Sequence, residues 1–136
     1  METQTQSNVL MASELFSDSS NNTSMLELGQ PRYSRRITDK VLAAFNHAYV
    51  LEEIELAQKL WEALVLAEEV SLRQHSRRRP NQAIELAERW VELVDSRSKY
   101  QKLSKDPALA ASPEAEEAYA DMRMAYRAWM EQFDES

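Results

Sequence analysis

Glycine is almost absent from this chain: its 136 residues include one glycine, Gly29, and four prolines. Sheet proteins need tight turns between most of their strands, and glycine and proline supply the backbone conformations of those turns. Residue types that lose least on entering a helix, such as Ala, Leu, Glu and Arg, dominate instead from Arg36 onward. The sequence therefore predicts an all-α protein, and its length corresponds to one domain.

Apolar residues recur at helical spacing in four segments after residue 33. We expect a small four-helix domain over residues 34–136, with helices at about 39–51, 54–76, 81–103 and 113–133. Thr38 and Asn81 are predicted to cap the first and third helices, and Ser112 followed by Pro113 is a typical start for the fourth. Each large apolar residue buried between them contributes about 1.5–3 kcal/mol, so we expect these helices to form a core without the preceding residues.

The apolar stripe of the first helix loses its helical spacing near Leu51. Continuing the same stripe would turn Glu52 and Glu55 toward the core, and the spacing resumes one residue out of step from Ile54. A tight helical hairpin explains this shift. One long bent helix is the alternative, because neither glycine nor proline marks the turn. In the hairpin, the start of the first helix lies near the end of the second.

Residues 1–33 differ in composition from the rest of the chain. They are rich in Gln, Ser, Asn and Thr, and SDSSNNTS at 17–24 is the most biased piece. Such a segment buries too little apolar area to offset its ordering entropy, so we expect a disordered N-terminal tail. Two apolar islands interrupt it, the first formed by residues 9–11 with 15 and 16, and the second by residues 25, 26 and 28.

The first apolar island is typical of a segment that binds a partner as a short amphipathic helix. Its candidate contact residues are Leu10, Met11, Leu15 and Phe16. The alternative is that the island folds back onto the domain of its own chain or has no role.

Two segments of the predicted helices look alike. IELAQKLWEAL at 54–64 and IELAERWVELV at 84–94 share Ile, Glu, Leu and Ala in the same order. The likeness stops outside these segments, whereas a tandem repeat matches over its whole period. We therefore interpret them as two helices that need the same kind of packing face.

The segment 41–64 resembles a single tetratricopeptide-type helical hairpin. Small residues at Ala44, Ala48 and Ala57 are placed to face across the pair, and Trp61 followed by Ala63 completes the likeness. The resemblance is partial, since the segment has no glycine in its first helix or at its turn. It implies a helical surface that binds peptides or proteins, and it implies no catalytic residues.

Residue types that carry chemistry form no recognisable catalytic or metal-binding motif. His47 and His75 stand apart, and no HExxH or ExxH pair occurs. The glutamates at 52–55, 68–69 and 114–117 are expected at solvated positions, whereas catalytic carboxylates need burial to separate their pKa values. We therefore expect no enzyme activity, no metal and no cofactor. An enzyme or ligand carrier whose site forms only in the folded protein is the alternative.

Arginines concentrate at two places that the hairpin would bring together. We call this set the arginine patch, and it consists of Arg32, Arg35, Arg36, Arg73, Arg77, Arg78 and Arg79. Three interpretations compete: charge that only complements a helix C-terminus, a site for an acidic protein surface or peptide, and a nucleic-acid site. The net charge of −7 disfavours the third, and Tyr33 is the single aromatic residue that stands among these arginines in the sequence.

These features predict a non-catalytic protein–protein interaction module, such as an adaptor, accessory subunit or regulator. It would dock through a helical face, the arginine patch and the tail, and a nucleic-acid-binding regulator is the alternative. The partner is expected to be another protein, and a homo-oligomer is a further possibility because the tryptophans and methionines exceed the needs of one small core. The chain has no cysteine, no secretory signal pattern and no run near the ~18 apolar residues of a membrane span, so we expect a soluble, cytoplasmic protein.

Overall fold

The computed structural model describes residues 22–74 and 81–134, and in these ranges the chain forms helices and no strand. The elements in chain order are α2 (Asn22–Leu28), α3 (Ile37–Val50), α4 (Ile54–Gln74), α5 (Gln82–Lys105), α6 (Pro113–Met130) and a short 3-10 turn, η2 (Glu131–Phe133). The predicted all-α class is confirmed. The bounds of the four longer helices are close to those expected from the sequence.

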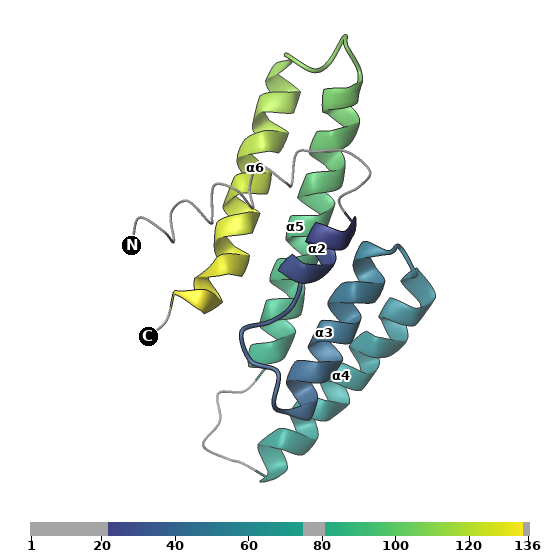
Figure 1. The fold of residues 1–136 in the computed structure, drawn as a ribbon, viewed down its shortest axis with the longest axis vertical. Helices are drawn as coiled ribbons and strands as arrows, with labels where there is room; N and C mark the ends of the chain where they lie inside the picture. Colours follow the sequence, from purple (N-terminus) through teal and green to yellow (C-terminus); the bar gives the residue numbers. More distant parts are fainter. Residues whose placement is uncertain (1–21, 75–80, 135–136) are drawn as a thin grey trace.

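Two helical hairpins make up the fold, and α2 lies across them (Figure 1). α5 and α6 form the longer hairpin, and α3 and α4 form the shorter one. α3 packs against both α4 and α5, whereas α4 meets α5 at few positions. α4 is therefore an edge helix, covered mainly on the side that faces α3.

The core has two parts that meet at α5. The first joins α2, α5 and α6, and its largest members are Trp90 and Trp129, whose ring centroids are 5.1 Å apart. The second joins α3, α4 and α5 around Leu42, Phe45 and Leu64. Half-buried side chains of α3 and α5 pack against both parts, so the two hairpins share one continuous apolar interior.

The segment from Met25 to Pro31 contributes buried residues to the fold, although the sequence placed it in the tail. Met25 is 1% exposed and Leu28 is 6% exposed. The Trp129 indole N–H donates to the carbonyl oxygen of Leu28 at 2.9 Å, and the Asn46 side-chain amide donates to that of Gly29 at 2.8 Å. Buried donors of this kind need acceptors, and the end of α2 supplies them. The predicted boundary after residue 33 is therefore wrong for this segment, while residues 1–21 lie outside the described residues.

The turn between α3 and α4 spans Leu51 to Glu53 and forms the predicted hairpin. Glu52 has φ of 60°, a left-handed conformation that usually falls to glycine. The Glu52 and Glu53 amides donate to the carbonyls of Tyr49 and Ala48, both at 3.1 Å. These bonds satisfy the end of α3 and hold the turn without a glycine.

The helix starts agree with the predicted caps at one position of three. The Ser112 hydroxyl accepts from the Ala115 amide at 3.2 Å, as expected for the start of α6. Because α3 begins at Ile37, Thr38 lies inside its first turn and not at the N-cap position. Thr38 is also buried. Asn81 makes no side-chain cap bond. At the start of α5, the Ala83 amide instead donates to Glu68 of α4 at 3.1 Å.

A hydrogen bond also links α3 to α5 at the edge of the core. The Tyr49 hydroxyl donates to Asp95 at 2.8 Å. Desolvation and this bond to a carboxylate raise the pKa of Tyr49 to about 12, so the phenol keeps its proton at pH values where a free tyrosine ionises. In the described ranges, no helix combines the length and the apolar character needed to cross a bilayer.

Candidate functional site

The groups that carry chemistry are dispersed over the described part of the chain. His47 is exposed on α3, and His75 lies outside the described residues. Residues 22–74 and 81–134 contain no group of three or more His, Asp or Glu side chains placed to hold a metal ion. Glu68 corrects one expectation, because it is 2% exposed and not solvated. Its carboxylate accepts a hydrogen bond from the first turn of α5 and therefore has a structural role.

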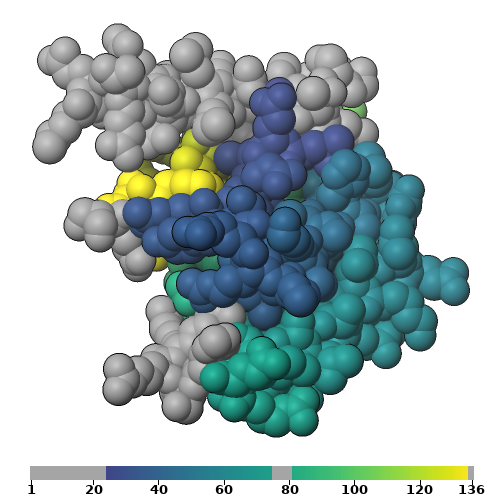
Figure 2. Space-filling view, turned by 60° about the horizontal axis from the view of Figure 1, so that its bottom comes forward, coloured from purple at the N-terminus to yellow at the C-terminus, as the bar shows by residue number. Residues whose placement is uncertain are grey.

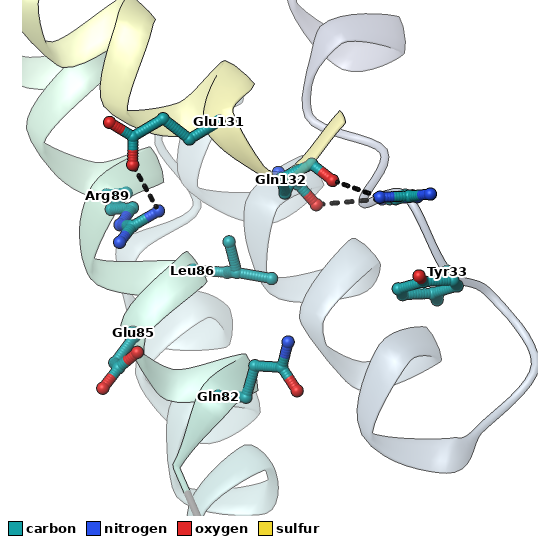
Figure 3. Close-up of a pocket in the computed structure, with 8 residues that line it drawn as sticks. Tyr33, Gln82, Glu85, Leu86, Arg89, Glu131 and Gln132 are labelled. Carbon is teal, nitrogen blue, oxygen red and sulfur yellow. Dashed lines mark hydrogen bonds and ion pairs between the residues drawn. The ribbon is translucent and has the colours of Figure 1, made fainter. Parts of the chain in front are cut away.

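Arg32 of the arginine patch is bound by the C-terminal end of the fold. Its guanidinium donates to the Gln132 carbonyl at 3.0 Å, and its backbone amide donates to the Gln132 side chain at 2.9 Å (Figure 3). Arg89 likewise donates to the Ala128 carbonyl at 3.1 Å and pairs with Glu131 at 3.5 Å. Cations at the carbonyl end of α6 complement the helix dipole, so these two arginines act as caps.

The space between these arginines is a small pocket of about 100 Å³ (Figure 3). Tyr33, Gln82 and Leu86 contribute to its lining, together with the two arginines. It is large enough for a few water molecules or a small ion. Because both of its arginines already bind carbonyls of the C-terminal segment, we assign the pocket a structural role.

The other members of the arginine patch remain at the surface where the structure describes them. Arg35, Arg36 and Arg73 are exposed. Arg36 and Gln74 line one groove, so the start of α3 does meet the end of α4, as the predicted hairpin requires. Arg77, Arg78 and Arg79 lie outside the described residues, as do the tail candidates Leu10, Met11, Leu15 and Phe16.

An apolar groove of about 550 Å³ lies between α3 and α4, and we call it the α3–α4 groove. Figure 2 shows these two helices side by side at the surface. The groove is lined by Arg36, Ile37, Thr38, Val41, Ala63, Leu66, Ala67, Val70, Ser71 and Gln74. Ile37 is 73% exposed and Leu66 is 57% exposed, so two large aliphatic side chains on its walls are open to solvent.

The groove exists because α4 carries more apolar surface than the described fold covers. Only Ala57, Leu64 and Glu68 are buried among the 21 residues of α4, whereas six residues of the 18-residue α6 are buried. One apolar stripe of α4 faces α3. A second apolar stripe, also at helical spacing, lies beside the first. This second stripe consists of Leu56, Ala63, Leu66 and Val70.

The two edges of the groove carry different charge. On α3, Arg36, Lys40 and His47 are exposed and follow one edge at helical spacing, with no acidic residue among them. On α4, the exposed glutamates at 55, 62 and 69 repeat every seven residues along the opposite edge. Lys59 and Arg73 lie beside them, and Lys59 pairs with Glu62 at 3.7 Å. The α3 edge is therefore basic, and the α4 edge is mixed with a row of carboxylates.

This groove was not predicted from the sequence, although Arg36 at one end of it was. The usable signal was the second apolar stripe of α4, which is wider than contact with one neighbouring helix requires. Comparison of the chain with protein-family models, curated proteins and solved structures finds no match.

Proposed function

We propose that this protein is a non-catalytic protein–protein interaction module, working as an adaptor, accessory subunit or regulator. Its docking surface is the α3–α4 groove, which receives a helical surface of another polypeptide chain. The observation that carries this proposal is the exposure of Ile37 and Leu66 in an apolar groove on a helix with only three buried residues. An exposed apolar groove with polar residues at its edges is typical of binding sites for amphipathic helices.

The lining residues also favour a protein over a small molecule. A ligand pocket encloses its ligand and offers convergent polar groups. The α3–α4 groove is open along one side, and aliphatic side chains form most of its walls. Arg36 and Lys40 on its basic edge suit an occupant that presents carboxylates beside its apolar stripe.

Nucleic-acid binding draws less support from the same surface. Arg32 is engaged by Gln132, and the α4 edge presents a row of glutamates beside the groove. Phosphate binding requires accumulated positive charge, and the chain as a whole has a net charge of −7.

Site-specific photocrosslinking tests the proposal. A benzophenone amino acid replaces Leu66 in the groove, or Met124 on the exposed face of α6, which at 69% exposure is a matched control. After irradiation in extracts of the source cells, we expect discrete protein adducts from position 66 and not from position 124. Reversing the basic edge with Arg36→Glu and Lys40→Glu should weaken those adducts.

Three results would contradict the proposal. Identical adduct patterns from the two positions would remove the groove as the docking surface. Adducts of nucleic acid at position 66 would favour the alternative regulator. Adducts that persist at full yield after reversal of the basic edge would exclude the proposed role of that edge.

A further inference from the structure

We propose that the occupant of the α3–α4 groove is a second copy of this chain, with the two α3–α4 hairpins packed face to face about a two-fold axis parallel to the helices. This inference rests on the proposed docking role of the groove and adds the identity of the partner. Its basis is the charge on the two groove edges and the position of those charges along the hairpin.

The symmetry operation decides which helices meet. A two-fold axis that runs along the groove places α3 of one copy over α4 of its partner, and the reverse. Such an interface is isologous, because the same patch serves both copies. A two-fold axis across the groove would instead place α3 over α3 and α4 over α4.

The charges favour the axis along the groove. In that arrangement the basic edge of α3 faces the glutamate row of α4 in the partner, twice per dimer. In the other arrangement, Arg36 and Lys40 would face the same two cations of the partner, and the glutamates would face glutamates. Like charges opposed at an interface are repulsive, so the edges select one of the two packings.

The cations of α3 and the glutamates of α4 lie at similar positions along the length of the hairpin. Phe45 of α3 packs against Trp61 of α4, with ring centroids 5.5 Å apart. In an antiparallel pair, each step back along α3 is matched by one step forward along α4. Arg36 is therefore level with Val70, and Lys40 is level with Leu66.

Rotation about an axis along the groove leaves the position of each residue along the helices unchanged. The partner's charges can therefore be placed. Arg36 faces the neighbourhood of Glu69 in the second copy, one residue from level. Lys40 comes between Glu62 and Glu69 of that copy, four residues from the level of Glu62 and three from that of Glu69. The opposed charge nearest in level to each of these two cations is thus a carboxylate, with Arg73 of the second copy farther from Arg36 than Glu69 is, while the apolar linings of the two grooves close on each other.

The size of the face suits a dimer of moderate affinity. At ~1.5 Å per residue, α4 with 21 residues is about 31 Å long and α3 with 14 residues is about 21 Å long, and each helix is about 10 Å wide. The resulting face of roughly 500 Å² lies below the ~800 Å² per partner of a standard interface. We therefore expect dissociation in the micromolar range.

Sedimentation of the full-length protein and its edge variants tests the inference. The variant Arg36→Glu with Lys40→Glu makes both edges acidic, and the variant Glu62→Lys with Glu69→Lys makes both edges basic. Each variant alone should dimerise at least tenfold more weakly than the unmodified chain. An equimolar mixture of the two should recover dimers, because each edge of one variant then opposes an edge of opposite charge in the other.

Leu66→Glu and Met124→Glu provide the matched apolar controls. We expect Leu66→Glu to abolish the dimer and Met124→Glu to leave it unchanged, with circular dichroism verifying that both remain folded. A chain that stays monomeric at several hundred micromolar overturns the inference, as does a dimer insensitive to Leu66→Glu. Failure of the mixture to recover dimers overturns the pairing of α3 with α4.

The result also separates this inference from the proposed function. If the protein is monomeric but position 66 still crosslinks to another protein in extracts, the groove is a docking surface with a different occupant. If neither dimers nor position-specific adducts appear, both proposals are wrong.

Discussion

Gly29, the one glycine of the chain, is required by a close approach and not by its backbone conformation. A Cβ atom at this position would lie 2.9 Å from Cζ2 of Trp90, which is closer than side-chain carbons pack. Trp90 is fully buried, and its indole N–H donates to the Asn46 carbonyl at 3.1 Å. The ring therefore has little freedom to move away.

Gly29→Ala should lower the free energy of unfolding by about 1–3 kcal/mol, the usual cost of overpacking a core. Urea denaturation measures this change, and Ser34→Ala, at an exposed site in the same linker, serves as the control. In a Trp90→Phe background the alanine should cost less, because the smaller ring leaves room for the added carbon. Equal costs in both backgrounds would show that contact with Trp90 is not the cause.

The sequence predicted few of these individual contacts. The scarcity of glycine indicated the fold class, but it gave no reason for glycine at position 29. The contact joins Gly29 to Trp90 across 61 residues of chain, and only the packing of α2 on α5 creates it. Glu68 is a similar case, since its place in a run of glutamates predicted a solvated side chain while its neighbours in space bury it.

At the scale of elements, Glu68 connects the end of one hairpin to the start of the other. It lies on α4, and its carboxylate accepts from the Ala83 amide in the first turn of α5. The first amides of a helix lack partners within the helix, and a carboxylate near them also complements the helix dipole. The cap thus comes from a neighbouring helix instead of the preceding residue.

Glu68→Ala should lower the free energy of unfolding by about 1–3 kcal/mol, because it leaves a buried amide without an acceptor. Glu68→Gln keeps one acceptor oxygen and should cost less. Chemical denaturation compares both with Glu88→Ala, an exposed position on α5 where we expect a change within about 0.5 kcal/mol. A Glu68→Ala protein as stable as the control would show that the cap contributes nothing.

Element positions were the most predictable level of this structure. Apolar spacing located the four longer helices, and the shift of that spacing near Leu51 indicated the hairpin. Ser112 capped α6 as expected because its cap is local in sequence. Asn81 occupies the N-cap position of α5 as predicted, but its side chain makes no cap bond, since the acceptor comes from Glu68 of α4 and no local pattern records that.

At the scale of the whole molecule, α2 ties the two hairpins together. Met25 and Leu28 enter the core part shared by α5 and α6, and Gly29 is bonded by Asn46 of α3. The predicted tail boundary failed here because the polar composition of residues 1–33 was given more weight than the second apolar island at residues 25, 26 and 28. Those residues become core only when the tryptophans of α5 and α6 are beside them.

Met25→Ala should lower the free energy of unfolding by about 2–5 kcal/mol, as expected when a fully buried side chain leaves a cavity. The matched control is Met124→Ala, which removes an exposed methionine from α6 and should change stability by less than about 0.5 kcal/mol. Equal stabilities of the two variants in thermal or urea unfolding would place α2 outside the cooperative fold.

The candidate site was predictable only at one end. The local clustering of arginines pointed to Arg36, but Arg32 is held by Gln132, a contact that requires α6 to return to the start of the domain. Leu66 and Val70, which form apolar walls of the groove, were assigned no role from the sequence. Whether a stripe on α4 is covered depends on how α5 packs, and α5 leaves that stripe open.

The bond between Leu28 and Trp129 joins positions 101 residues apart. During synthesis, α2 leaves the ribosome long before the helix that covers it. At translation rates of ~5–20 residues per second, its apolar side waits about 5–20 s for Trp129 to emerge. The nascent chain therefore completes its fold only after α6 has been made, and until then the side of α2 that packs on α6 stays uncovered.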